Sequence, residues 1–246
     1  MSDAVAIAWR QYRLERRMFW RNPSAAFFNF VLPLLFLALF GAIYAGSQED
    51  LDVLVPGIAG MSIVSATFVA LAHNLVFLRE QGVLKRLRGT PMPTGAYLGA
   101  LAAHAVTNAA VQLGIVVVAG KLLFGIGWPK DWLALGVFAT AGVTCFALLG
   151  AALAHAIPNF DSAPAYVNAA FLPLISISGV FYDADEALAF LRDIAEALPL
   201  THLIDGLSGA LVTGASHWSD LVVIGLWTAA GAALAVRGFS WEARRS

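Results

Sequence analysis

The stretch that organises this chain reads REQGVLKRLRGTPMP and runs from Arg79 to Pro93. It places four cations and one acid within the ten residues 79–88, between two apolar runs that are each long enough to cross a bilayer. A bilayer core of about 30 Å needs about 20 apolar residues in a helix, and charged side chains are costly inside it. The stretch therefore predicts a water-exposed loop between two membrane-spanning helices.

The composition of the whole chain agrees with this prediction. Of the 246 residues, 59% are hydrophobic and 13% are charged, and the mean hydropathy is +0.75. Soluble domains carry about 25% charged residues. We therefore expect an all-α membrane protein with a single transmembrane domain over residues 1–246. The single cysteine, Cys145, offers neither an internal disulfide nor a metal cluster.

Six apolar segments are predicted to span the membrane, at about 24–46, 53–78, 95–124, 132–157, 165–181 and 219–239. Between the last two, acidic and apolar residues alternate over 182–213, which predicts a pair of short helices that are either re-entrant or interfacial. Of the 15 Lys and Arg residues, 12 fall on one side of this topology. The positive-inside rule then places both termini in the cytoplasm.

The segment 1–22 predicts an amphipathic helix that lies on the membrane surface. Arginines recur at helical spacing on one side, and aromatic residues fall on another. The candidate interfacial residues are Trp9, Arg10, Tyr12, Arg13, Arg17, Phe19, Trp20 and Arg21. A solvated helix without a membrane role is the alternative, but it would leave four large aromatic side chains in water.

The charged loop itself has the pattern of a short helix. Val83, Leu84 and Leu87 cluster on one face together with the single acid, and a glycine and two prolines follow to end the helix. A rigid amphipathic helix suits a groove on a soluble partner, whereas a plain positive-inside loop is the alternative. The candidate coupling residues are Arg79, Glu80, Gln81, Gly82, Val83, Leu84, Lys85, Arg86, Leu87 and Arg88.

Polar residues within the spans are mostly neutral. His104, Asn108 and Gln112 are spaced four apart and share one helical face, which favours interhelical hydrogen bonding over a polar lining for a substrate path. The sequence contains no phosphate loop of the form G-x-x-x-x-G-K-[ST] and no catalytic or metal-binding motif. We therefore expect no ATPase site, cofactor or metal on this chain.

Two motifs resemble those of a known family. Residues 79–91 are similar to the signature R-E-x-G-T-L-x-x-L-R-x-T-P of type-2 ABC (ATP-binding cassette) exporter permeases, in the drug- and antibiotic-export branch, with Val83 in place of the usual threonine. Residues 178–181 and 198–203 resemble the family's second signature, S-G-x-F followed by L-P-L-T-H. Ser208 stands before Gly209, where the family usually has arginine.

This resemblance implies a half-transporter in a bacterial or archaeal inner membrane. Two permease chains, a homodimer rather than a heterodimer, would pair, and each would dock a separate ATPase subunit through the loop 79–93. That subunit would hold ATP and Mg. The substrate would be amphipathic or hydrophobic, such as a drug, a polyketide antibiotic or a lipid-linked compound. No nucleic-acid partner is expected, and an ion-gradient-driven carrier or a membrane scaffold is the alternative.

Overall fold

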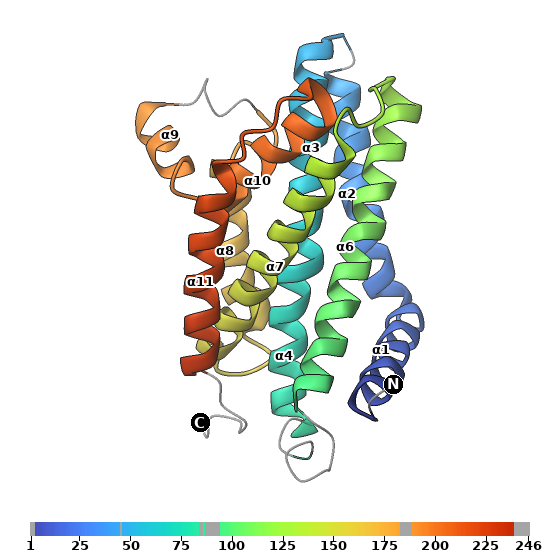
Figure 1. Cartoon of the computed structure of the whole chain (residues 1–246), viewed down its shortest axis with the longest axis vertical. Helices are drawn as coiled ribbons and strands as arrows, with labels where there is room; N and C mark the ends of the chain where they lie inside the picture. Colours follow the sequence, from blue (N-terminus) through green and yellow to red (C-terminus); the bar gives the residue numbers. More distant parts are fainter. Residues whose placement is uncertain (1–2, 45, 84–85, 87–93, 183–187, 239–246) are drawn as a thin grey trace.

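The computed structural model describes residues 3–44, 46–83, 86, 94–182 and 188–238. Within these ranges the regular elements are all helical, as predicted, and form one bundle (Figure 1). In chain order they are α1 (Asp3–Trp20), α2 (Pro23–Ile43), α3 (Gln48–Val64), η1 (Ser65–Val69), α4 (Ala70–Glu80), α6 (Thr94–Phe124), α7 (Trp132–Ala156), α8 (Ala163–Ile177), α9 (Ala189–Ala195), α10 (Pro199–Ser208), η3 (Gly209–Thr213) and α11 (Asp220–Gly238).

One continuous helix, formed by α3, η1 and α4 over Gln48–Glu80, lies at the centre of the bundle. Ser47 caps its start, because the Ser47 side chain accepts a hydrogen bond from the Asp50 amide at 3.2 Å. The helix contacts α2, α6, α7 and α10. Of its most apolar window, 78% is buried inside the protein. This helix, predicted as the second span, is therefore the core against which the others pack.

The central helix lies very close to the backbone of its neighbours at two glycines. A Cβ atom added to Gly57 would lie 2.1 Å from the carbonyl oxygen of Val180, just after α8. A Cβ atom added to Gly150 of α7 would lie 2.6 Å from the carbonyl oxygen of Phe68, in the π-helical segment η1. Inside a membrane the hydrophobic effect does not drive helices together. Small residues at such crossings instead let the helix backbones approach closely enough to pack.

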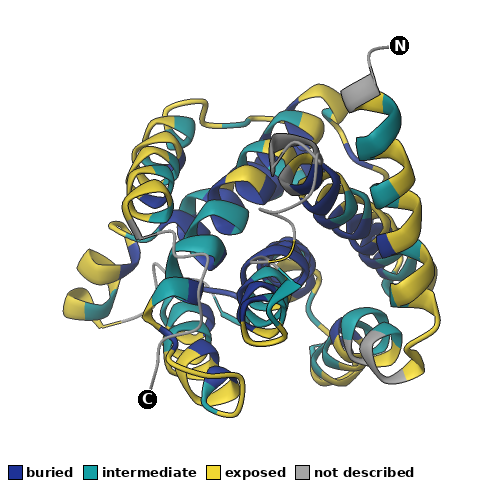
Figure 2. Cartoon of the chain, turned by 90° about the horizontal axis from the view of Figure 1, so that it is seen from below, coloured by how far each residue is buried: buried dark blue, intermediate teal, exposed yellow. Residues whose placement is uncertain are grey.

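The outer surface of the bundle is apolar. Only 11% of the most apolar window of α11 is buried, against 39% for α7 and 44% for α6. Exposed fractions reach 65% at Leu226 and 79% at Val236. Figure 2 shows these exposed outer faces around a buried centre. Burying apolar surface is worth about 25 cal/mol per Å² in water, so a surface of this kind belongs in a bilayer.

Within the part of the chain that the structure describes, four helices are long and apolar enough to cross a membrane, namely Gln48–Glu80, Gly99–Phe124, Trp132–Ala156 and Asp220–Arg237. They correspond to the predicted second, third, fourth and sixth spans. At the predicted first and fifth spans, α2 and α8 are helical as expected. Their apolar stretches, Asn29–Ile43 and Ala163–Ile177, are shorter than those of the four long helices. A count of six crossings therefore stays a prediction, as does the side on which each terminus lies.

Two short helices precede α11, in the segment where a pair was predicted. They lie at the end of the bundle opposite the start of α1 and the end of α11 (Figure 1). α10 is buried against α3, α7 and α11, and Leu200, Leu203 and Leu207 each have 0% exposed surface. α9 keeps exposed apolar side chains such as Phe190. Thus α10 lies inside the bundle, whereas α9 lies at its edge.

Candidate coupling site and N-terminal helix

Arg79 anchors the end of the central helix. Its side chain is 5% exposed. Its Nη1 donates a hydrogen bond to the carbonyl oxygen of Ala154 at 3.0 Å, and its Nη2 donates to the carbonyl oxygens of Ile157 and Pro158. These acceptors lie at the C-terminal end of α7, where backbone carbonyls lack helical partners and carry partial negative charge. A guanidinium group satisfies several of them at once.

The next residue, Glu80, contacts the turn that follows the end of α7. Its Oε2 accepts a hydrogen bond of 2.6 Å from the amide of Phe160, in the turn that joins α7 to α8. The ring of Phe160 also packs edge-on against Phe77 of α4, with 5.5 Å between ring centroids. Two consecutive charged residues therefore fasten the end of α4 to the α7–α8 turn. We call Arg79 and Glu80 the α4 clamp.

This geometry corrects one sequence-based interpretation. Arg79 and Glu80 were expected to belong to a single helix with the loop, with Arg79 on its polar side. Instead α4 ends at Glu80, and Gln81 and Gly82 form a turn in which Gly82 has a φ of +66°. Only glycine adopts that conformation without strain. The interpretation was wrong because the periodicity of the loop holds no information on the carbonyl oxygens at the end of α7. These oxygens accept hydrogen bonds from Arg79, which is therefore buried.

A new helical turn begins after Gly82, since the amide of Arg86 donates to the Gly82 carbonyl oxygen at 3.0 Å. The Arg86 side chain in turn donates to the carbonyl oxygen of Gln81 at 2.7 Å. Val83 is half-buried. The remaining candidates, Leu84, Lys85, Leu87 and Arg88, lie outside the described residues. The proposed apolar face of the loop helix thus stays a prediction.

The N-terminal helix α1 is docked on α6 and α2. The hydroxyl groups of Tyr12 and Thr107 are 3.1 Å apart, and the ring of Phe19 packs edge-on against His104 at 5.5 Å. Trp9 and Trp20 each keep 55% of their surface exposed. The predicted aromatic side is therefore divided between protein contact and exposure. The predicted cationic side is exposed throughout, at Arg10, Arg13, Arg17 and Arg21.

The polar side chains of α6 do share one face, and each of them has a polar partner in the protein, although His104 Nδ1 and Gln112 Oε1 have none among the described residues. Asn108 Oδ1 accepts a hydrogen bond from Arg16 Nη1 at 2.8 Å, and Asn108 Nδ2 lies 3.2 Å from His104 Nε2. Gln112 Nε2 donates to the carbonyl oxygen of Asn29 in α2 at 2.6 Å. Asn108 and Gln112 are buried. These contacts support interhelical hydrogen bonding, the interpretation favoured from the sequence.

Two residues of α1 that the sequence did not single out have roles in this contact. Arg16 lies about 120° around the helix from Arg10 but only about 60° from Arg13, so helical spacing did not separate it from the exposed arginine stripe. Glu15 is 8% exposed and accepts a hydrogen bond from Gln11 Nε2 at 2.8 Å. Burial raises the pKa of the Glu15 carboxyl, and the Gln11 hydrogen bond opposes that rise.

The second motif ends α8 and starts α10. Gly179 has a φ of +74°, which ends α8 with a left-handed residue. Phe181 then stacks on Phe40 of α2 at 4.8 Å. Pro199 occupies the first turn of α10, where its missing amide proton costs nothing. The motif thus sets where two helices stop and start.

The sequence comparison joins these features to a family. Residues 4–212 match the ABC-2 type transporter family. The chain belongs to this family. Members of the ABC-2 family are membrane transport components and not enzymes themselves, and they normally pair with an ABC ATPase. The α4 clamp and the loop after it carry the family's first motif in this permease.

Three proteins illustrate what this ABC-2 permease is similar to. It is 26% identical over 210 residues to the putative transport permease ycf38 of Porphyra purpurea, covering 79% of this chain and 71% of that protein. It is 28% identical over 149 residues to nodulation protein J of Rhizobium leguminosarum bv. trifolii, covering 60% and 56%. It is 26% identical over 171 residues to the linearmycin resistance permease protein LnrN of Bacillus subtilis (strain 168), covering 68% and 44%.

Proposed function

We propose that this chain is the membrane-spanning half of an ATP-driven exporter. Two copies would pair, and each would dock a separate ATPase subunit at the loop 79–93. The observation that carries the proposal is the α4 clamp. Because Arg79 and Glu80 tie the end of α4 to the end of α7 and to the turn before α8, a force on the loop would move three helix ends together.

Movement of the loop would also be transmitted to the N-terminal helix. α6 follows the loop in the chain, and α1 is tied to α6 by the Arg16–Asn108 and Tyr12–Thr107 contacts. A displaced loop would therefore carry α1 with α6. Exposed arginines along α1 suit anionic lipid headgroups at the membrane surface. We infer that α1 moves along the inner surface when the ATPase subunits close.

The remaining features of the proposal come from topology and from the relatives. Both termini and the loop 79–93 would lie in the cytoplasm, since 12 of the 15 cations then do so. The apolar faces of the outer helices and the resistance named for LnrN favour an amphipathic or hydrophobic substrate, taken from the cytoplasm or the inner leaflet. ATP and Mg would bind to the partner subunit.

Co-purification with an ABC ATPase subunit tests the assignment. The permease is expressed with that subunit, and complex recovery and ATP hydrolysis are measured for three single variants. We expect Leu84→Arg to reduce complex recovery, because it places a charge on the proposed docking face. We expect Glu80→Ala to keep the complex but to lower ATP hydrolysis stimulated by transported substrate.

The matched control is Glu49→Ala, which removes an exposed acid at the other end of the central helix. It should match the unsubstituted chain in both measurements. If Leu84→Arg and Glu80→Ala leave complex recovery and stimulated hydrolysis unchanged, the coupling role of this loop is wrong. Failure of any ABC ATPase to co-purify would instead favour a carrier or a scaffold.

A further inference from the structure

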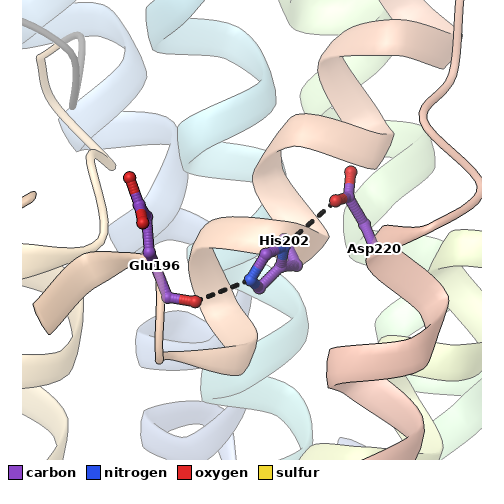
Figure 3. Close-up of polar contacts among 3 residues, drawn as sticks. All are labelled: Glu196, His202 and Asp220. Carbon is purple, nitrogen blue, oxygen red and sulfur yellow. Dashed lines mark hydrogen bonds and ion pairs between the residues drawn. The ribbon is translucent and has the colours of Figure 1, made fainter. Parts of the chain in front are cut away.

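A second polar cluster lies at the other end of the bundle, between α10 and α11. His202 of α10 faces Asp220, the first residue of α11, with 3.0 Å between Nδ1 and Oδ1. Its Nε2 lies 2.8 Å from the backbone carbonyl oxygen of Glu196, in the turn before α10. Figure 3 shows the ring held between these two oxygens. The side chains of His202 and Asp220 are only 16% and 14% exposed.

The chemistry of the two oxygens constrains the ring. A carbonyl oxygen can only accept a hydrogen bond, so Nε2 carries a proton. If the ring is neutral, Nδ1 then presents a lone pair, and a lone pair facing an ionised carboxylate oxygen at this distance is repulsive. A proton or a metal ion between Nδ1 and the Asp220 oxygen removes this repulsion.

A third ligand distinguishes the two cases. Asp205 lies three residues after His202 on α10, so both side chains project from the same face of the helix. One ligand atom from each of His202, Asp205 and Asp220 lies within 4.8 Å of the others. Asp220 Oδ2 is buried and has no hydrogen-bond partner among the described residues. A proton between Nδ1 and Oδ1 would leave this second oxygen without a partner, whereas a metal ion could bind it together with a carboxylate oxygen of Asp205.

We propose that His202, Asp205 and Asp220 form a binding site for a divalent transition-metal ion of the zinc type. Imidazole with carboxylates suits zinc and nickel, whereas magnesium and calcium prefer all-oxygen sites. Zinc ligands lie about 2.0–2.2 Å from the ion, so ligand atoms in a tetrahedral site are about 3.3–3.5 Å apart. That spacing falls within the 4.8 Å over which the three ligand atoms are gathered. The Glu196 carbonyl serves as the outer partner that fixes the ring tautomer.

The site would connect α10 with the start of α11 through three side chains. Trp227 Nε1 of α11 donates to the carbonyl oxygen of Ala197 at 2.9 Å, which already ties α11 to the turn between α9 and α10. A bound ion would add a second tie between α10 and the start of α11. The proposal does not depend on the exporter function, because it rests only on these side chains.

Zinc titration of the purified full-length chain in detergent tests the site. After a chelator is removed, calorimetry should detect one high-affinity zinc ion per chain, and Co²⁺ should give the visible absorption of a site with nitrogen and oxygen ligands. We expect Asp205→Asn, His202→Gln and Asp220→Asn each to weaken zinc binding by about 10-fold or more. Zinc should raise the melting temperature of the unsubstituted chain but not that of these three variants.

Asp205→Asn is the decisive variant, because the side chain is exposed and the substitution keeps its size while it removes the charge. The control is His217→Ala, which removes an exposed histidine three residues before Asp220. It should leave zinc affinity unchanged. The proposal is overturned if the chain binds no zinc, or if Asp205→Asn binds zinc as tightly as the unsubstituted chain. In either case the charge between His202 and Asp220 is a proton.

Discussion

Arg79 Nη1 lies 3.0 Å from the carbonyl oxygen of Ala154, although the two residues are 75 positions apart in the chain. A permanently charged side chain thus closes the C-terminal end of α7 from inside the protein. The same residue starts the stretch that resembles the first motif of the ABC-2 permeases. The first two residues of that stretch, Arg79 and Glu80, therefore hold the end of α4 against the end of α7 and the turn that follows it.

The first prediction concerns the stability contributed by this contact. Arg79→Ala leaves buried carbonyl oxygens of α7 without donors, each of which costs about 1–3 kcal/mol. We expect a clear fall in the melting temperature of the purified protein, measured by intrinsic tryptophan fluorescence in detergent. Arg86→Ala is the control, because Arg86 is exposed and its side chain donates a hydrogen bond to the nearby Gln81 carbonyl. Equal melting temperatures for the two variants would contradict the clamp.

The second prediction concerns the docking of α1. Arg16→Ala and Asn108→Ala should each loosen α1 from α6, and the double variant should lose little more than either single one. A hydrogen bond to a charged group is worth about 1.5–3 kcal/mol, so the double-mutant cycle should give a coupling of that order. Arg13→Ala, on the exposed side of α1, should show no coupling to Asn108→Ala. Additive effects for Arg16 and Asn108 would count against the contact.

The third prediction follows from the raised pKa of Glu15. The pKa of the Glu15 carboxyl is higher in the folded state than in the unfolded state, where it is near the ordinary 4.5. The folded state therefore binds this proton more tightly. Stability contributed at this site is therefore present below pH 4.5 and falls as the pH rises to the folded-state pKa. Glu15→Gln should raise the melting temperature at neutral pH and flatten this dependence. Glu49→Gln, at an exposed acid, should do neither, and a melting temperature lowered by Glu15→Gln would refute the assignment.

The fourth prediction concerns close helix packing. Gly57→Ala places a methyl group 2.1 Å from the Val180 carbonyl oxygen, and backbone cannot move aside cheaply. Overpacking of a core costs about 1–3 kcal/mol, and this contact should lie at the upper end. Gly114→Ala is the matched control, because an added Cβ there meets nothing within 4 Å. Size-exclusion profiles and melting temperatures should separate the two variants, and identical behaviour would contradict the crossing.

Hydropathy predicted most of the fold because each helix is a local, strongly apolar segment. The central helix, α6, α7 and α11 lie where apolar runs predicted them, and the short pair α9 and α10 lies where the pattern changed. The spacing of His104, Asn108 and Gln112 also identified a shared face correctly. Local periodicity was enough for these features.

The sequence could not predict hydrogen-bond partners that lie far apart in the chain. Nothing near Arg79 indicates that it meets the end of α7, and nothing near His202 indicates Asp220 or the Glu196 carbonyl. Such pairs depend on how helices cross, which periodicity within one helix does not encode. The π-helical segment η1 was missed for a similar reason, since its residues follow the same apolar pattern as the α-helix around them.

Transport by proteoliposomes tests the central claim most directly. The permease and its ATPase subunit are reconstituted together, and accumulation of a hydrophobic fluorescent dye is followed with ATP, without ATP, and with an ion gradient alone. The proposed mechanism predicts accumulation only with ATP and a strong reduction for Glu80→Ala with an intact complex. Accumulation driven by the ion gradient without ATP would contradict it.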